Sequence, residues 1–152
     1  MRKIVRDVEL TDGHRRMVVV AVGKGEDAVA AINEVAERYC IRGAQVTAVG
    51  GFKSAELGYF DRGKRTYLGI PVREQVEVLS LLGDIADNQG KPALHVHTVL
   101  GHRDGTTVGG HLLRGEVWPT LEVIITEVGA NLTKQIDQET GLALLPWTHG
   151  AE

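Results

Sequence analysis

EDAVAAINEVAERYCIRGAQVTAVGGF, residues Glu26–Phe52, changes its apolar period part-way along. From Glu26 to Arg42 the apolar residues recur at steps of three and four, which predicts an amphipathic helix that Gly43 would end. Beyond Gly43 the period becomes two, which predicts a strand over Ala44–Phe52. A helix that leads directly into β-structure indicates that helix and sheet share one core.

Strand patterns dominate the chain on both sides of this stretch. Turn residues between several of them make the connections short, so neighbouring strands are expected to pair antiparallel. The sequence therefore predicts an α+β fold, with one main helix packed on a curved, mostly antiparallel sheet of about seven strands. The tail Leu132–Trp147 is amphipathic and is assigned no definite element. The further strands are predicted at Met17–Val22, Ser54–Asp61, Thr66–Val72, Gln75–Leu82, Ala93–Leu100 and Thr120–Val128.

The composition narrows the class of protein. A chain of 152 residues with 43% hydrophobic and 24% charged residues excludes intrinsic disorder and predicts one domain over residues 1–152. Lys plus Arg number 17 against 20 Asp plus Glu, a net charge of −3, whereas nucleic-acid binders usually carry a basic surplus. No apolar run reaches the roughly 20 residues of a membrane helix.

The N-terminus and the cysteine usage bear on the compartment. No apolar run follows Met1-Arg2-Lys3, so a signal peptide is not expected. Cys40 is the single cysteine, so it cannot form an internal disulfide, and in the predicted helix it is expected to pack against the core. We therefore expect a cytoplasmic protein.

The segment His95–His111, HVHTVLGHRDGTTVGGH, contains four of the six histidines and carries the chemistry. His95 and His97 lie two apart on a predicted strand, so their imidazoles share one face, about 7 Å apart. Two histidines in this spacing can offer two nitrogen ligands to zinc. The sequence therefore predicts that His95 and His97 form part of a metal site.

His111 is the natural third ligand, because the Asp104-Gly105 turn folds the following segment back onto the strand. A strict two-residue hairpin would place His97 opposite Leu112 and turn His111 to the wrong side. A bulge or bend at Gly109-Gly110 would shift the register by one residue and correct this. His102, near the turn, is interpreted as a surface loop residue.

Three neutral imidazoles around Zn²⁺ leave a fourth position open, which can hold water or an anionic ligand. Glu56, Asp61 and Asp104 are candidate carboxylates to assist, but no motif assigns a catalytic role. The alternative is that the histidines form hydrogen bonds in a polar seam between subunits. Gly50-Gly51 is interpreted as a bulge, because neither of the two glycine-rich sequence patterns of phosphate-binding loops occurs in full. No organic cofactor is therefore expected.

Several segments together resemble the plants and prokaryotes conserved (PPC) domain family, in order and in spacing. The resemblance implies a compact α+β domain that assembles as a homotrimer. It is to the stand-alone prokaryotic type, some members of which bind zinc through histidines at the positions of His95, His97 and His111. The segments are Val49–Asp61, Glu77–Ala86, His95–His97, Arg103–Gly115 and Thr120–Val128.

Plant members of the family join this domain to an AT-hook, Arg-Gly-Arg-Pro, and bind AT-rich DNA in the nucleus. This chain has only Ile41–Ala44 and Asp61–Lys64 as partial matches, so the DNA-contacting element is missing. We therefore expect a homotrimer with a zinc site at His95, His97 and His111. We expect it to act by small-ligand binding or metal-assisted hydrolysis, with a small anionic ligand at the metal and without membrane association.

Two alternatives stay open. A regulatory DNA-binding protein would need a basic face, for which the sequence offers Arg2, Lys3, Arg6, Arg15 and Arg16, and its binding would fall steeply with salt. An assembly or partner-binding module without catalysis would need exposed apolar strand edges that other subunits cover.

Overall fold

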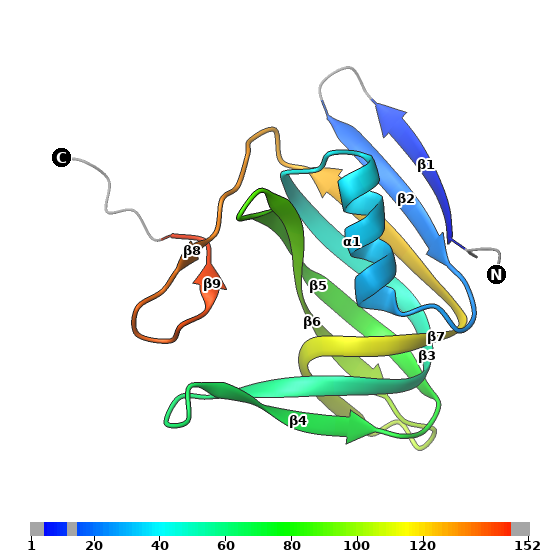
Figure 1. The fold of residues 1–152 in the computed structure, drawn as a ribbon. Helices are drawn as coiled ribbons and strands as arrows, with labels where there is room; N and C mark the ends of the chain where they lie inside the picture. The colour runs from blue at the N-terminus through cyan, green and yellow to red at the C-terminus, as the bar shows by residue number, and fades with distance from the viewer. Residues whose placement is uncertain (1–4, 12–14, 147–152) are drawn as a thin grey trace.

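The computed structural model describes residues 5–11 and 15–146. One helix and a strongly curved sheet form the main body, with a small two-stranded sheet beside it (Figure 1). The elements are β1 Val5–Thr11, β2 Arg16–Val22, α1 Ala28–Arg38, β3 Gly43–Asp61, β4 Thr66–Val72, β5 Val76–Asn88, β6 Lys91–Gly101, β7 Thr107–Glu127, β8 Gln135–Ile136 and β9 Ala143–Leu144.

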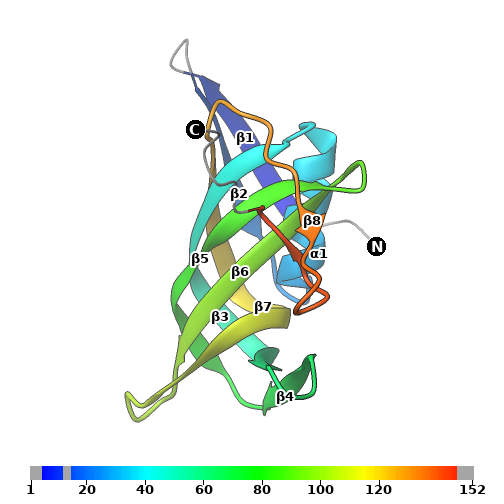
Figure 2. The same ribbon diagram turned by 90° about the vertical axis from the view of Figure 1, so that its left-hand side faces the viewer.

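The main sheet has seven strands in the order β1-β2-β7-β6-β5-β3-β4, and every neighbouring pair is antiparallel. β7 also pairs with β3, so β3, β5, β6 and β7 close on themselves like a barrel. Figure 2 shows the outer face of β5 and β6, with α1 behind them. The predicted α+β class and the expectation of about seven strands are confirmed.

The helix is shorter than predicted, because both of its ends are set by local hydrogen bonds. Asp27 caps its start by accepting a hydrogen bond from the Ala30 N–H at 2.9 Å. Its last residue is Arg38 and Tyr39 is the C-cap, since Cys40 adopts a left-handed φ of +54° and Ile41 N–H donates to Ala36 C=O. Cys40 therefore takes the place expected for Gly43, and its side chain is exposed rather than packed in the core.

One face of α1 packs into the concave side of the sheet (Figure 1). Its buried residues recur at the predicted helical spacing, and around them lie the apolar side chains of β2, β3, β5, β6 and β7. No helix within the described ranges is long and apolar enough to cross a membrane. The buried helix residues are Ala28, Ala31, Ile32, Val35 and Ala36.

The long strands β3 and β7 bend to close the barrel. The strands predicted at Ala44–Phe52 and Ser54–Asp61 form one continuous strand, and Thr120–Val128 corresponds to the second half of β7. A register shift in the pairing with β5 falls between Ala48 and Gly50, which confirms the predicted bulge.

Gly50 is required at this bulge, so its replacement by alanine is expected to destabilise the protein. Its φ is +152°, and a Cβ atom there would lie 2.2 Å from the backbone oxygen of Thr120. We expect Gly50→Ala to lower the free energy of unfolding by about 2 kcal/mol or more, because backbone rather than a flexible side chain must move. Urea unfolding measures this, with Gly63→Ala as the control, since only the Asp61 side chain lies near that site. Equal stability of the two variants would contradict the prediction.

Candidate metal centre

His95 and His97 lie on β6 and project to the same face, as the period of two predicts. β6 pairs with β5 along its whole length, and this pairing fixes its orientation. The centroids of the two imidazole rings are 5.1 Å apart. Two of the three predicted ligands are therefore neighbours because of the local geometry of one strand.

His111 joins them from β7, directly opposite His97 in the β6–β7 pairing. The expected bulge at Gly109-Gly110 is wrong, since the pairing from His97–His111 to Gly101–Thr107 is regular. The loop sets the register instead. His102 N–H donates to Thr106 C=O and Gly105, with φ +84°, donates to His102 C=O. A three-residue loop closed by a left-handed glycine shifts the register by one from a two-residue hairpin.

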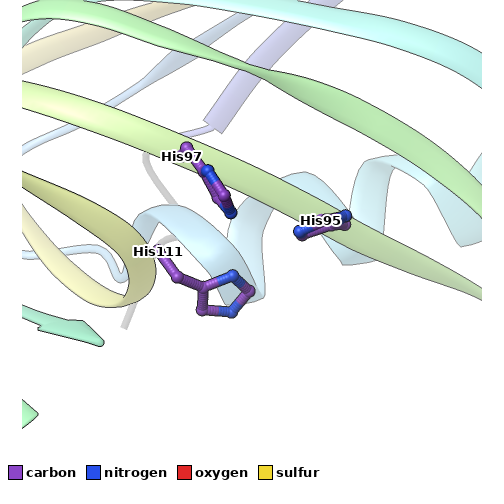
Figure 3. A group of neighbouring side chains, drawn as sticks. All are labelled: His95, His97 and His111. Carbon is purple, nitrogen blue, oxygen red and sulfur yellow. The ribbon is translucent and has the colours of Figure 1, made fainter. Parts of the chain in front are cut away.

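The three imidazoles converge on one small space (Figure 3). One nitrogen from each ring can be chosen so that all three lie within 4.8 Å of one another. Tetrahedral zinc with Zn–N distances of 2.0–2.1 Å needs its ligand nitrogens about 3.4 Å apart. The chosen nitrogens are therefore at most about 1.4 Å farther apart than this spacing, so small side-chain rotations would be needed to hold the ion.

His111 has an environment that suits a neutral ligand. Its ring stacks on Tyr67 with centroids 4.6 Å apart, and its buried Nδ1 has no hydrogen-bond partner among the residues described. Burial lowers the pKa of His111 to about 4, and the nearby positive groups act in the same direction. Burial and His95 also lower the pKa of His97. Neutral imidazole is the form that binds metal, so both shifts favour a ligand role.

Asp84 and Lys134 form a second layer behind the histidines. Asp84 Oδ2 lies 3.6 Å from His95 Nδ1, and Asp84 Oδ1 lies 3.6 Å from Lys134 Nζ. Burial alone would raise the pKa of Asp84, but its contacts with His95 and Lys134 outweigh this and hold that pKa below its usual value. A carboxylate at Nδ1 orients the ring so that Nε2 faces a metal.

A pocket of about 220 Å³ opens beside the histidines. Two of the predicted ligands, His95 and His111, lie in its wall, whereas His97 does not. The small β8–β9 sheet contributes part of this wall, which gives the tail a defined place that the sequence did not predict. The other lining residues are Tyr67, Asn88, Ala93, Leu94, Lys134, Leu142, Ala143 and Leu144.

The other residues singled out in the sequence lie elsewhere. His102 follows β6 in the loop, as predicted, and its Nδ1 lies 3.0 Å from Glu74 Oε1. The carboxylate of Asp61 accepts a hydrogen bond from the Lys64 N–H and that of Asp104 accepts one from the Thr106 N–H, so both serve their own turns. Glu56 lines a different pocket, with Arg73 and Arg114.

The basic face proposed for DNA binding is largely committed to other contacts or not described. Arg16 forms an ion pair with Glu127 at 2.7 Å and donates to the Tyr39 carbonyl oxygen. The described part of the chain does not include Arg2, Lys3 or the side chain of Arg6. The end of the predicted tail, at Trp147, also lies outside it.

Comparison with known proteins agrees with this fold. The family model of the Plants and Prokaryotes Conserved (PCC) domain matches residues 10–129. The chain belongs to the PCC domain family, also abbreviated PPC. A plant- and prokaryote-conserved protein from Pyrococcus horikoshii has a PCC fold with 28% identity and a TM-score of 0.82, over 94% of this chain and 96% of that one. No curated protein matches the chain.

Two further solved structures with this fold are described by different ligands, a metal in one and DNA in the other. A metal-containing protein from Archaeoglobus fulgidus is 31% identical, with a TM-score of 0.80 over 96% of this chain and all of the other. A candidate DNA-binding protein from Bacteroides thetaiotaomicron is 21% identical, with a TM-score of 0.84 over 92% and 96% of the two chains. At that identity the second likeness bears on the fold alone.

The low pKa of His111 predicts how the stability of this PCC domain depends on pH when no metal is bound. The unfolded chain takes up a proton at His111 near pH 6.5, whereas the folded chain does so near pH 4. The contribution of neutral His111 to the free energy of unfolding is therefore fully present above about pH 6.5, and it is lost as the pH drops towards 4. After allowance for partial solvent screening, we expect a loss of about 1 kcal/mol from this group.

Thermal unfolding of the chelator-treated protein between pH 7.5 and 4.5 measures this effect. The variant His111→Gln keeps a polar side chain and cannot titrate there, so its unfolding temperature is expected to fall less over the same range. A wild-type slope that His111→Gln reproduces in full would show that other groups cause it.

Proposed function

We propose that this PCC domain is a homotrimer that binds one zinc ion per chain at His95, His97 and His111, and a small anionic ligand beside that ion. One observation carries the proposal: three imidazoles from two strands converge within 4.8 Å. When bound, the ion would supply a positive charge and an open coordination position for a ligand. The chain's own residues supply the ring orientation and the pocket.

The residues present suit a zinc ion by their chemistry. Nitrogen ligands from three histidines with one open position are a common arrangement at non-structural zinc sites. The buried Nδ1 of His111 has no protein partner in the described part of the chain, and leaving such an atom unsatisfied costs about 1–3 kcal/mol. The metal-containing relative from Archaeoglobus fulgidus, at 31% identity, supports the same reading.

An exposed apolar face supports assembly of the chain into trimers. Thr47 of β3 lies opposite Ile124 of β7 and Leu82 of β5, and Leu82 lies opposite His97 of β6. Because cross-strand partners lie on one face of a sheet, these side chains share the outer surface. Large apolar side chains on this outer surface are 42% to 55% exposed, which is costly unless a subunit covers them. They are Val49, Leu79, Leu82, Val99 and Ile124, named here the outer apolar face.

The pocket supports ligand binding rather than hydrolysis. Its described lining residues include no carboxylate, and Asp84 behind it already contacts His95 and Lys134. A general base must lie within hydrogen-bond reach of the group it deprotonates. None of the three carboxylates considered from the sequence lines this pocket, so we assign no catalytic residue.

DNA binding is not taken up in this proposal. Of the basic set, Arg15 and Arg16 have described side chains, and Arg16 is paired with Glu127. The net charge of the chain is −3. A phosphate backbone needs several unpaired cations on one surface. A pure assembly module would contain no bound metal, so the metal content of the purified protein distinguishes it from the proposed function.

The proposal is tested on protein purified without an affinity tag or added metal. Elemental analysis is expected to give about one zinc per chain. Light scattering is expected to give three times the chain mass of 16.5 kDa. Protein without metal that also takes up none on dialysis against zinc would overturn the metal site, and a monomer would overturn the assembly.

A further inference from the structure

Lys134 is the residue beside the histidines to which the proposed function gives no role. Its side chain is only 6% exposed, yet it forms part of the wall of the pocket that His95 and His111 line. Backbone hydrogen bonds hold it there, since Lys134 N–H donates to Asp87 C=O and Asp87 N–H donates to Leu132 C=O, each at 2.7 Å. The position of this lysine is therefore determined by the fold.

With a divalent ion on the histidines, the positive charge around the pocket would exceed the negative charge that balances it. A lysine ammonium has three donors, and within the described residues its one acidic partner is Asp84, at 3.6 Å. The other oxygen of Asp84 faces His95. With a divalent ion on the histidines, this single carboxylate would face both the ion and Lys134. Charges that are partly removed from water favour a counter-ion, so the pocket favours an anion.

The rest of the pocket wall is mainly apolar. Leu94 comes from β6, and Leu142 and Leu144 come from the segment that ends in β9. The turn of that segment is held by Asp137, which accepts hydrogen bonds from the N–H and hydroxyl of Thr140. A pocket of about 220 Å³ lies below the roughly 300–1,000 Å³ typical of pockets for drug-sized ligands, so it suits a small molecule.

We infer that this pocket binds a small aliphatic carboxylate, with its carboxylate against Lys134 and its short hydrocarbon part against Leu94, Leu142 and Leu144. The inference rests on the proposed function, because the metal supplies the second positive charge. One cationic side chain suits a carboxylate, whereas a phosphate group usually receives several charge-assisted hydrogen bonds. The apolar walls set the preference for a hydrocarbon part over a second charged group.

Calorimetric titration of the zinc-loaded protein with sodium butyrate tests this inference. We expect Lys134→Met to weaken butyrate binding by about tenfold or more when the variants are compared at equal zinc loading, which elemental analysis measures. Lys134→Arg keeps the charge and is expected to restore most of the affinity. The matched control is Lys53→Met, since the Lys53 side chain is 68% exposed and pairs with Glu116 away from the pocket.

The outcomes separate this inference from the proposed function. n-Butylammonium has the same hydrocarbon part with the opposite charge, and it is expected not to bind. Zinc-loaded wild-type protein that fails to bind butyrate, or that binds it as well after Lys134→Met, would overturn the carboxylate site and leave the metal site standing. Protein that binds no zinc would overturn both.

Discussion

Replacing His97 by alanine is expected to reduce the zinc content of the purified protein from about one ion per chain to almost none. Removal of one of three ligands leaves His95 and His111, which lie on different strands and present only two nitrogens. Two imidazoles on a surface compete poorly with solution ligands, whereas three with one open position form a stable zinc site. Elemental analysis of dialysed protein measures the change.

The matched control for this prediction is His102→Ala. His102 lies in the same segment of sequence but outside the three-histidine group, and its Nδ1 faces Glu74. The His102→Ala variant is therefore expected to keep about one zinc ion per chain. Since His97 is exposed, its replacement is not expected to disturb the core. Retention of zinc by His97→Ala, or equal loss from both variants, would show that the ion binds elsewhere.

Placing a charge on the outer apolar face is expected to convert the proposed trimer into monomers. Leu82 is 55% exposed, and its register partners Thr47 and His97 continue the same face on either side. An aspartate there would place a carboxylate in each copy of an apolar interface, which costs several kcal/mol per buried, unpaired charge. The measured mass is expected to fall from three chains to one at micromolar concentration.

Ile136→Asp serves as the control for Leu82→Asp. Ile136 is 51% exposed but lies on β8, in the small sheet outside the seven-stranded one. The control is expected to keep the wild-type mass, and circular dichroism checks that both variants fold. Should Leu82→Asp also remain trimeric, a different surface must form the subunit contact.

Much of the fold followed from local periodicity. The helical spacing in Glu26–Arg42 and the β-branched run Met17–Val22 each gave an element of the right type, because the face that a side chain takes depends on its own segment. The helix end was wrong, since Gly43 was expected to stop it and Cys40 does so by adopting a positive φ. That conformation depends on hydrogen bonds around the end of the helix and not on residue type alone.

The candidate site divides in the same way. His95 and His97 could be placed together from sequence, because two residues two apart on a strand share a face. The register of His111 could not, since it depends on the conformation of the loop at Gly105. Asp84 and Lys134 were missed altogether. Asp84 carries no motif in β5, and Lys134 lies in a tail without strong periodicity.

The sequence by itself determined the element types and the shared face of His95 and His97. Only the tertiary structure decided that His111 faces His97, that Lys134 lies beside the pocket, and that apolar side chains remain exposed on the outer face. The physical reason is range. Side-chain direction along a strand is a local property, whereas strand register and the approach of distant segments depend on loops and pairings across the whole chain.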